Sequence, residues 1–326
     1  MKQFIKVFVV LGTTGVLTWY AFKGSDLQAI WELLKGVNYL LLFPFMLCLG
    51  AMLWANAYRV TLLMSPLGRF SVKQVTPSMM IGFGANNLLP ARLGEIIRIL
   101  AMAKQFQVSK ASLFTMVVLE RLLDVFAILL FFLLTYLLIT PFPDPLLATS
   151  HVMGLSFTLV TVGILFFVYK PVFFEKLWRM LTQWIPSISD RGAQIIHQLS
   201  EGLGSIKSFK TLALSLAFSL IRWFLSSLLV WISLYAFGVE VDLLIPLVVI
   251  AVSAIALTLP NAPGFFGAMQ AVFVFALPPF GVTQEIALAA SIFYLLMQWI
   301  PITLIGGYYY LKLKEDIAED LEEAIK

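Results

Sequence analysis

Two stretches of the chain decide the fold: residues 86–95, which read NNLLPARLGE, and residues 259–267, which read LPNAPGFFG. Each interrupts a long apolar segment, 74–103 in the first half and 243–277 in the second. Proline removes a backbone donor and glycine readily adopts turn conformations, so a helix that meets either stretch is broken there. Broken apolar segments at corresponding places in two halves are typical of membrane proteins built from inverted repeats.

The composition around these breaks indicates a chain that lies in lipid. Its 326 residues are 60% hydrophobic and 12% charged, with a mean hydropathy of +0.94. Soluble domains have about 25% charged residues, and a membrane-spanning helix needs about 20 apolar residues. The apolar runs are long and continuous, unlike the short alternating segments of a β-barrel. The sequence therefore predicts an all-α polytopic membrane protein.

Six apolar helices are expected to cross the membrane, and the last of them is kinked at Pro301. They span residues 7–22, 37–64, 112–139, 152–169, 211–237 and 285–311. Amphipathic stretches at 26–35 and 170–210 follow the first helix of each half, and each half then continues with a helix, a broken segment and a helix. This order predicts a first repeat at 1–150, a second at 151–311 and a charged cytoplasmic tail at 312–326.

The distribution of Lys and Arg predicts how the chain is oriented, because cytoplasmic loops are enriched in both residues. Basic residues at 2–6, 69–73, 104–110 and 170–210 place these regions, and the tail, in the cytoplasm; the loops at 140–150, 238–242 and 278–284 have none. Segments 74–103 and 243–277 then each enter and leave on one face, as re-entrant hairpins from opposite sides. Only Lys23 and Lys35 oppose this scheme.

Eight simple crossings are the alternative topology, and a cleaved signal peptide is an alternative for the N-terminus.

Charged residues within the apolar segments are the candidate binding residues, because a charge inside a bilayer is costly and usually has a partner or a function. The candidates are Asn87, Arg92, Glu95, Arg98, Glu120, Arg121, Asp124 and Arg222. On one interpretation, the carboxylates and arginines pair and hold the first hairpin in place. On the other, the arginines bind an anionic headgroup, because the guanidinium fork suits phosphate.

Proline and glycine at the breaks are the candidate hairpin-tip or gating residues. These are Pro90, Gly94, Pro260, Pro263, Gly264 and Gly267, with Gln270 following the second break. They either form tight tips or allow a gate to move.

Catalytic and cofactor sites are not expected. No Ser-His-Asp order, HExxH motif or phosphate-binding loop is present, and the chain has one Cys and two His. This composition predicts no disulfide, no metal site and no cofactor. The net charge of +4 is explained by the cytoplasmic loops and does not indicate a nucleic-acid partner.

Several motifs resemble those of the lysylphosphatidylglycerol synthase transmembrane family. Residues 87–98, NLLPARLGEIIR, resemble its N-x-L-P-x-R-x-G-E-x-x-R signature, and residues 120–124, ERLLD, resemble its E-R-x-x-D motif. Residues 263–267, PGFFG, resemble its second-half loop, and Phe293-Tyr294 with the Pro301 helix resemble its last span. In place of the Glu that often follows that loop in the family, this chain has Gln270, which argues against a proton-linked role there.

The resemblance implies a lipid translocase without the soluble aminoacyltransferase domain of the fused synthases. We therefore expect no enzymatic activity but movement of phosphatidylglycerol-class or other lipid-linked anionic headgroups across a prokaryotic cytoplasmic membrane. A second copy of the chain or a lipid-synthesising enzyme is the candidate protein partner. The alternatives are a membrane-embedded enzyme or accessory of polyprenyl-phosphate or lipid-linked sugar metabolism, and a non-catalytic partner that docks through residues 170–210.

Overall fold

The computed structural model describes residues 2–186, 188–190, 192–196, 209–256 and 262–325. Within these ranges the chain forms α-helices and short 3-10 turns without strands, which confirms the all-α fold. Pro260 lies outside the described residues.

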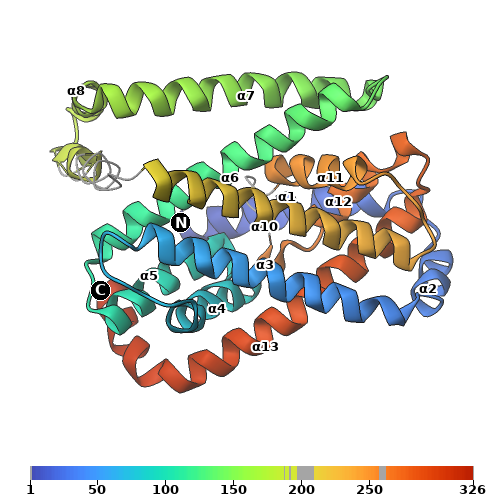
Figure 1. The fold of residues 1–326 in the computed structure, drawn as a ribbon, viewed down its shortest axis with the longest axis horizontal. Coiled ribbons are helices and arrows are strands. Elements are labelled where there is room, and N and C mark those ends of the chain that lie inside the picture. Colours follow the sequence, from blue (N-terminus) through green and yellow to red (C-terminus); the bar gives the residue numbers. More distant parts are fainter. Residues whose placement is uncertain (1, 187, 191, 197–208, 257–261, 326) are drawn as a thin grey trace.

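The first half begins with a 21-residue helix and contains one helical hairpin (Figure 1). In chain order its elements are α1 (Lys2–Phe22), α2 (Leu27–Lys35), the turn η1 (Tyr39–Leu41), α3 (Leu42–Leu63), α4 (Val72–Leu88), the turn η2 (Pro90–Arg92), α5 (Leu93–Phe106) and α6 (Lys110–Leu138).

The second half repeats this order. Its elements are α7 (Asp144–Tyr169), α8 (Pro171–Thr182), α10 (Phe209–Ala236), α11 (Leu244–Ala256), the turn η3 (Pro263–Phe265), α12 (Ala268–Ala276), the turn η4 (Pro278–Phe280) and α13 (Gln284–Ile325). Both broken segments are therefore helix–break–helix units, and we call α4–η2–α5 the first hairpin and η3 with α11 and α12 the second hairpin.

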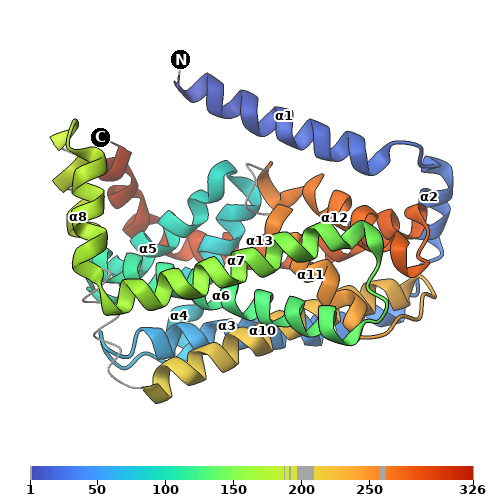
Figure 2. The same cartoon turned by 90° about the horizontal axis from the view of Figure 1, so that it is seen from above.

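The two hairpins occupy opposite ends of the molecule (Figures 1 and 2). The first lies in the half that holds α8 and the C-terminus, and the second lies in the half that holds α2. Hydrogen bonds gather the turns at the α2 end: Gln284 Nε2 donates to the carbonyls of Ala21 and Lys23 at 3.2 and 3.1 Å, and Asn38 N donates to Ala236 O at 3.0 Å. The charge distribution predicts a common face for the loops at 238–242 and 278–284, whereas Lys23 and Lys35 oppose placing the stretch between α1 and α3 on that face.

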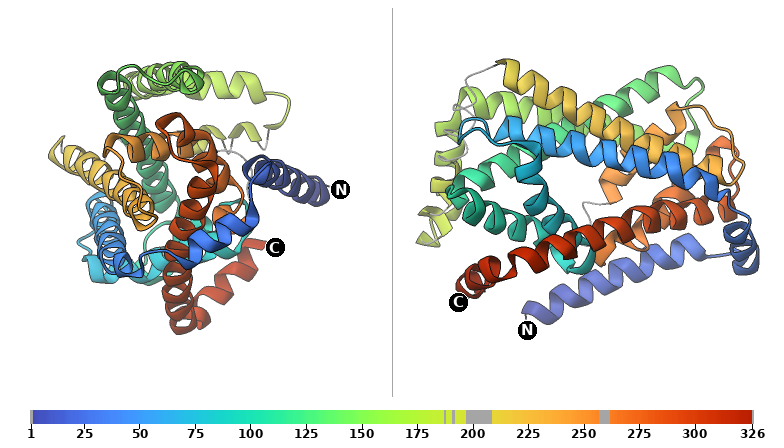
Figure 3. Two further views of the ribbon diagram at one scale, coloured as in Figure 1. Left: turned by 90° about the vertical axis from the view of Figure 1, so that its right-hand side faces the viewer. Right: turned by 60° about the horizontal axis from the view of Figure 1, so that its bottom comes forward.

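Long helices cross between the hairpins and tie the halves together (Figure 3). Helix α3 packs against α10, α13 packs against α4, and α6 packs against α11. Glycine allows the α4–α13 contact, since a Cβ built at Gly306 would lie 2.5 Å from Met80 O and 3.0 Å from the Gly84 Cα. Small residues are common at such close helix crossings in membranes.

Two helix boundaries differ most from the sequence-based prediction. Helix α7 begins at Asp144, eight residues before the expected start at 152, because Pro145 occupies the first turn, where a missing N–H costs nothing. Helix α13 continues for 42 residues, past Pro301 and through the charged tail.

Four helical stretches in the described part of the chain are long and apolar enough to cross a membrane. They are Tyr39–Leu63, Phe209–Ala236, Pro263–Phe280 and Gln284–Leu313. The chain is therefore a multi-pass membrane protein by the length and composition of its helices, and the number of six crossings stays a prediction.

Candidate functional site

The tip of the first hairpin brings its charged residues inward. Pro90 begins the η2 turn, and Arg92 adopts a left-handed backbone conformation with φ 55° that redirects the chain into α5. Gly94 then lets α5 fold back against α4, because a Cβ built there would lie 2.0 Å from Gly82 O. No residue larger than glycine fits this approach without moving the backbone.

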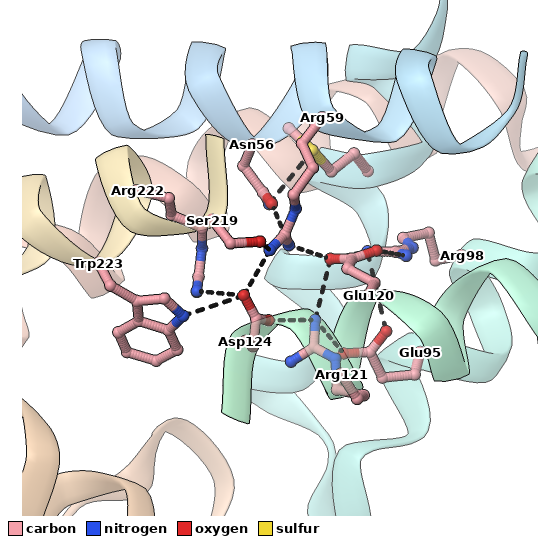
Figure 4. Close-up of polar contacts among 11 residues, drawn as sticks. Asn56, Arg59, Glu95, Arg98, Glu120, Arg121, Asp124, Ser219, Arg222 and Trp223 are labelled. Atoms are coloured by element: carbon pink, nitrogen blue, oxygen red, sulfur yellow. Dashed lines mark hydrogen bonds and ion pairs between the residues drawn. The ribbon is translucent and has the colours of Figure 1, made fainter. Parts of the chain in front are cut away.

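An arginine on α3, Arg59, is the centre of a buried charged network (Figure 4). Its Nη2 lies 2.8 Å from Glu120 Oε1, and its Nη1 donates to Asp124 Oδ1. The same side chain donates to Asn56 Oδ1 and Ser219 Oγ, both at 2.7 Å. Arg59 is fully buried, and it joins α3 to α6 and α10.

The first hairpin joins this network through Arg98 and Glu95. Arg98 is buried, and its Nη2 donates to Glu120 Oε2. Arg121 lies 3.0 Å from Glu120 Oε1, 3.7 Å from Glu95 Oε1 and 3.5 Å from Asp124 Oδ2. Helix α5 is thus held against α6 by ion pairs from both of its inward-facing charges.

Asp124 connects the network to α10. It accepts a hydrogen bond from Trp223 Nε1 at 2.9 Å and lies 3.4 Å from Arg222 Nη1. The Arg222 guanidinium also stacks over the Trp223 ring at 4.2 Å. Each of these donors offsets part of the hydration that the buried carboxylate loses.

A cavity of about 240 Å³ opens beside this network, between the two hairpins. Arg92, Glu95, Arg121 and Arg222 are the charged residues that line it. The rest of its wall is mostly apolar or aromatic, with several amides and hydroxyls, and includes Phe265 of the second hairpin. The cavity therefore places several guanidinium groups in a largely apolar surround, where electrostatic attraction is strong.

The second hairpin meets the first at this cavity. The Arg92 guanidinium lies over the Phe265 ring at 5.6 Å, and Phe265, like Arg92, has a positive φ, here 62°. Gly264 fits against Trp299 of α13, where a Cβ would lie 2.6 Å from the indole nitrogen. The two hairpin tips and α13 are in direct contact.

Cap and packing contacts hold the second hairpin. Gln270 Oε1 accepts from Gly267 N at 2.7 Å and so caps α12. Gly267 has φ 83°, and a Cβ there would lie 2.3 Å from Thr18 Oγ1 of α1. Ala262 N donates to Thr14 Oγ1 at 2.9 Å.

The structure divides the residues predicted as substrate-binding into two groups. Five line the cavity: Asn87, Arg92, Glu95, Arg121 and Arg222. Arg98, Glu120 and Asp124 do not line it and form the ion pairs behind its wall. Asn87 also holds α4 to α13, since its Nδ2 donates to Thr303 Oγ1 at 2.9 Å.

The residues predicted as tip or gate residues likewise take different positions. Gly264 lines the cavity, and Pro90 and Pro263 begin the two 3-10 turns. Gly94, Gly267 and Gln270 permit close packing or cap a helix, as described above.

Sequence analysis missed Arg59, which has the most hydrogen-bond partners of the described network residues. It lies four residues before the end of α3 at Leu63, so it resembles a basic residue flanking a membrane helix. Asn56 stands three residues earlier and therefore on the same helix face, and this spacing was the available signal for an inward-facing polar pair. Phe265 and Trp299 were missed too, because an aromatic residue in an apolar run carries no distinguishing pattern.

Comparison with known proteins gives consistent matches to membrane proteins. The family model described as lysylphosphatidylglycerol synthase TM region matches residues 3–306. A UPF0104 membrane protein of Pyrococcus horikoshii is 25% identical over 96% of this chain and 97% of its own length. UPF0104 membrane proteins of Methanothermobacter thermautotrophicus and Methanocaldococcus jannaschii are 23% and 22% identical over 72% and 75% of this chain, covering 73% and 76% of their own lengths.

Proposed function

Because the chain belongs to the family of the lysylphosphatidylglycerol synthase TM region, we propose that it is a translocase that moves phospholipid or lipid-linked headgroups between leaflets. The family assigns the protein a lipid-related role in a membrane. A headgroup enters the cavity from one leaflet and leaves it toward the other, while the acyl chains stay in lipid.

One observation carries this proposal: the charged cavity lies where the tips of two hairpins from opposite ends of the molecule meet. In transport folds with inverted repeats, the substrate site lies at the repeat interface near mid-membrane and is formed by discontinuous helices. A cavity in that place is within reach of both membrane faces when either hairpin moves.

The chemistry of the cavity wall supports a headgroup as the substrate. Its guanidinium groups provide paired donors for phosphate, while its apolar residues exclude bulk water. At about 240 Å³ the cavity is slightly smaller than pockets for drug-sized ligands, which begin at about 300 Å³. It accommodates a headgroup and not a whole lipid.

We place the protein in a prokaryotic cytoplasmic membrane with both termini in the cytoplasm. Cysteine labelling tests this orientation, since Cys48 is the one native cysteine. In a Cys48→Ser background, single cysteines at positions 69 and 240 are expected to react with a membrane-impermeant reagent from the cytoplasmic and the external side, respectively. Labelling of both from one side would reject the topology.

A leaflet assay tests translocation directly. The purified full-length chain is reconstituted in liposomes with a trace of fluorescent phosphatidylglycerol or its aminoacylated form, and dithionite measures the fraction of label that becomes accessible from outside. We expect faster exchange than in protein-free liposomes and a several-fold lower rate in Arg92→Ala. Arg69→Ala is the matched control, since it removes an exposed loop arginine that does not line the cavity. Equal rates in Arg92→Ala and wild type would reject the role of Arg92, and no exchange in wild type would reject translocation.

A further inference from the structure

Each half of the chain has a short amphipathic helix after its first long helix, and the two are held differently. In α2, Ile30 is buried, and Leu33 and Leu34 pack against the core. In α8, one face has the i, i+4, i+7, i+8 spacing of an amphipathic helix and consists of Phe173, Leu177, Met180 and Leu181. Three of these four side chains are exposed, Leu181 by 65%. The described part of the chain therefore leaves the apolar face of α8 largely uncovered.

Polar contacts on another side of α8 fix its rotation about its own axis. Arg179 Nη1 lies 3.1 Å from Asp190 Oδ1, and Trp178 Nε1 donates to Ile188 O at 3.2 Å. These contacts draw the segment that follows α8 onto the side of the helix that carries Trp178 and Arg179. The apolar face of α8 is not turned toward that segment and stays open.

Aromatic contacts with α7 show which way this apolar face points. Phe166 lies three residues before the end of α7 at Tyr169, and its ring centroid is 5.0 Å from that of Phe173 and 5.5 Å from that of Phe174. Successive helix residues are about 100° apart, so Phe173 and Phe174 stand on either side of Leu177. The middle of the apolar face is therefore turned back toward the body of α7.

The direction of α8 relative to α7 places this face in the membrane. Figures 1 and 2 show that α8 runs crosswise to α7 at its end. The sequence predicts that α7 crosses the membrane and ends in the cytoplasm, so a crosswise helix there lies along the membrane surface. A face that is turned back toward α7 then meets the acyl chains of the cytoplasmic leaflet and not the cytoplasm.

The charged residues of α8 fit the same placement. Lys176 is exposed and lies about 140° around the helix from Leu181, and Lys170 is exposed directly before the helix. Lysine side chains at such positions reach phosphate headgroups while their stems stay in the apolar layer. Trp184, which follows the helix, is 85% exposed, and tryptophan is enriched at the level of the headgroups.

We propose that α8 is a surface anchor whose partner is the boundary between headgroups and acyl chains in the cytoplasmic leaflet. Its apolar face enters the acyl layer, and Lys170 and Lys176 contact the headgroups, as in helices that lie in the plane of the interface. Because α7 packs against α6 and α8, the anchor fixes the cytoplasmic end of α7 at the level of the leaflet. This lipid contact is separate from the cavity and does not depend on translocation.

Spin-label accessibility on the full-length chain tests the proposal. In a Cys48→Ser background, a single nitroxide is attached at Leu181→Cys or Lys176→Cys, and the protein is reconstituted in vesicles of phosphatidylethanolamine and phosphatidylglycerol. Collision rates with oxygen, which concentrates among acyl chains, and with a water-soluble nickel chelate are then measured. Leu304→Cys is the reference for a site in lipid, since Leu304 is 68% exposed on α13.

We expect the ratio of oxygen to nickel collisions to be several-fold higher at position 181 than at position 176 and close to that at position 304. Equal, low ratios at 181 and 176 would overturn the proposal, because the apolar face of α8 would then lie in water. A label at 181 that is shielded from both reagents would also overturn it, because a protein would then cover this face.

A charged substitution tests whether the apolar face itself sets the depth of α8. Met180→Asp is expected to lower the collision ratio at position 181 toward the value at 176. Gln183→Asp is the matched control, since it adds the same charge at an exposed position outside the apolar face and is expected to leave the ratio unchanged. A ratio that Met180→Asp does not lower would overturn the anchoring role, because α7 alone would then hold α8 at its depth.

Discussion

The two hairpins have similar backbones and are held in place by different forces. In each, a proline begins a 3-10 turn and a residue with positive φ precedes the next helix. Glu95 and Gln270 occupy the same position, the third residue of the helix after the break. Gln270 caps its own helix, whereas Glu95 reaches to Arg98 and Arg121.

This difference suggests a division of roles. Ion pairs in a low-dielectric interior fix the first hairpin against α6, so Arg92 keeps its place at the cavity. The second hairpin is attached by a cap, by glycine packing and by the ring of Phe265. Contacts of this kind cost less to break, so the second hairpin is the one that we expect to move.

Loss of an ion pair in the first hairpin gives the largest expected effect. Arg98→Met removes the buried partner of Glu120 Oε2, and breaking a buried ion pair typically costs about 3–5 kcal/mol. The apparent free energy of unfolding in mixed micelles, with Arg69→Met as the control, measures this loss. A cost equal to that of the control would show that ion pairs do not hold the hairpin.

The close approach inside the first hairpin gives the next largest effect. Gly94→Ala places a methyl group against Gly82 O, and overpacking of this kind costs about 1–3 kcal/mol. Gly50→Ala on α3 is the matched control, since a Cβ there meets nothing within 4 Å and alanine favours a helix by up to about 1 kcal/mol. Thermal melting in detergent is expected to shift down for Gly94→Ala and up or not at all for Gly50→Ala. A shift in the same direction for both would contradict the packing argument.

The helix–break–helix units could be predicted from the local sequence, and the candidate site could be predicted only in part. Proline and glycine dictate the breaks, whereas the sidedness of the loops, which rests on the distribution of Lys and Arg, stays a prediction. Sequence patterns placed Glu120, Arg121 and Asp124 on one face of a helix.

Partners that come from distant helices were beyond this reasoning. Arg59 meets Asp124 and Ser219 across 65 and 160 residues of sequence, and no local pattern encodes such a meeting. The same holds for the contact of Arg92 with Phe265. The separation of Arg98 from the cavity also depends on how α5 is rotated, which the packing of Gly82 against Gly94 decides.

Loss of the cap in the second hairpin should have a smaller effect. Gln270→Ala removes the oxygen that accepts from Gly267 N, and loss of a helix cap costs typically about 1 kcal/mol. Ala271→Ser is a nearby control on the same helix that leaves the cap intact. If Gln270→Ala destabilised the protein as strongly as Arg98→Met, the two hairpins would be held equally firmly and the proposed division of roles would fail.

The contact between the tips should be the weakest, and it is the one that a moving second hairpin must break. A double-mutant cycle with Arg92→Gln and Phe265→Leu isolates this contact, because leucine keeps apolar bulk and glutamine keeps a polar head. A cation–π pair with an exposed arginine is worth about 0.5–1 kcal/mol, and we expect the coupling energy of unfolding to lie in that range. A coupling of this size lets thermal motion separate the tips, whereas a coupling near that of the buried ion pairs would lock the cavity shut and contradict a mobile second hairpin.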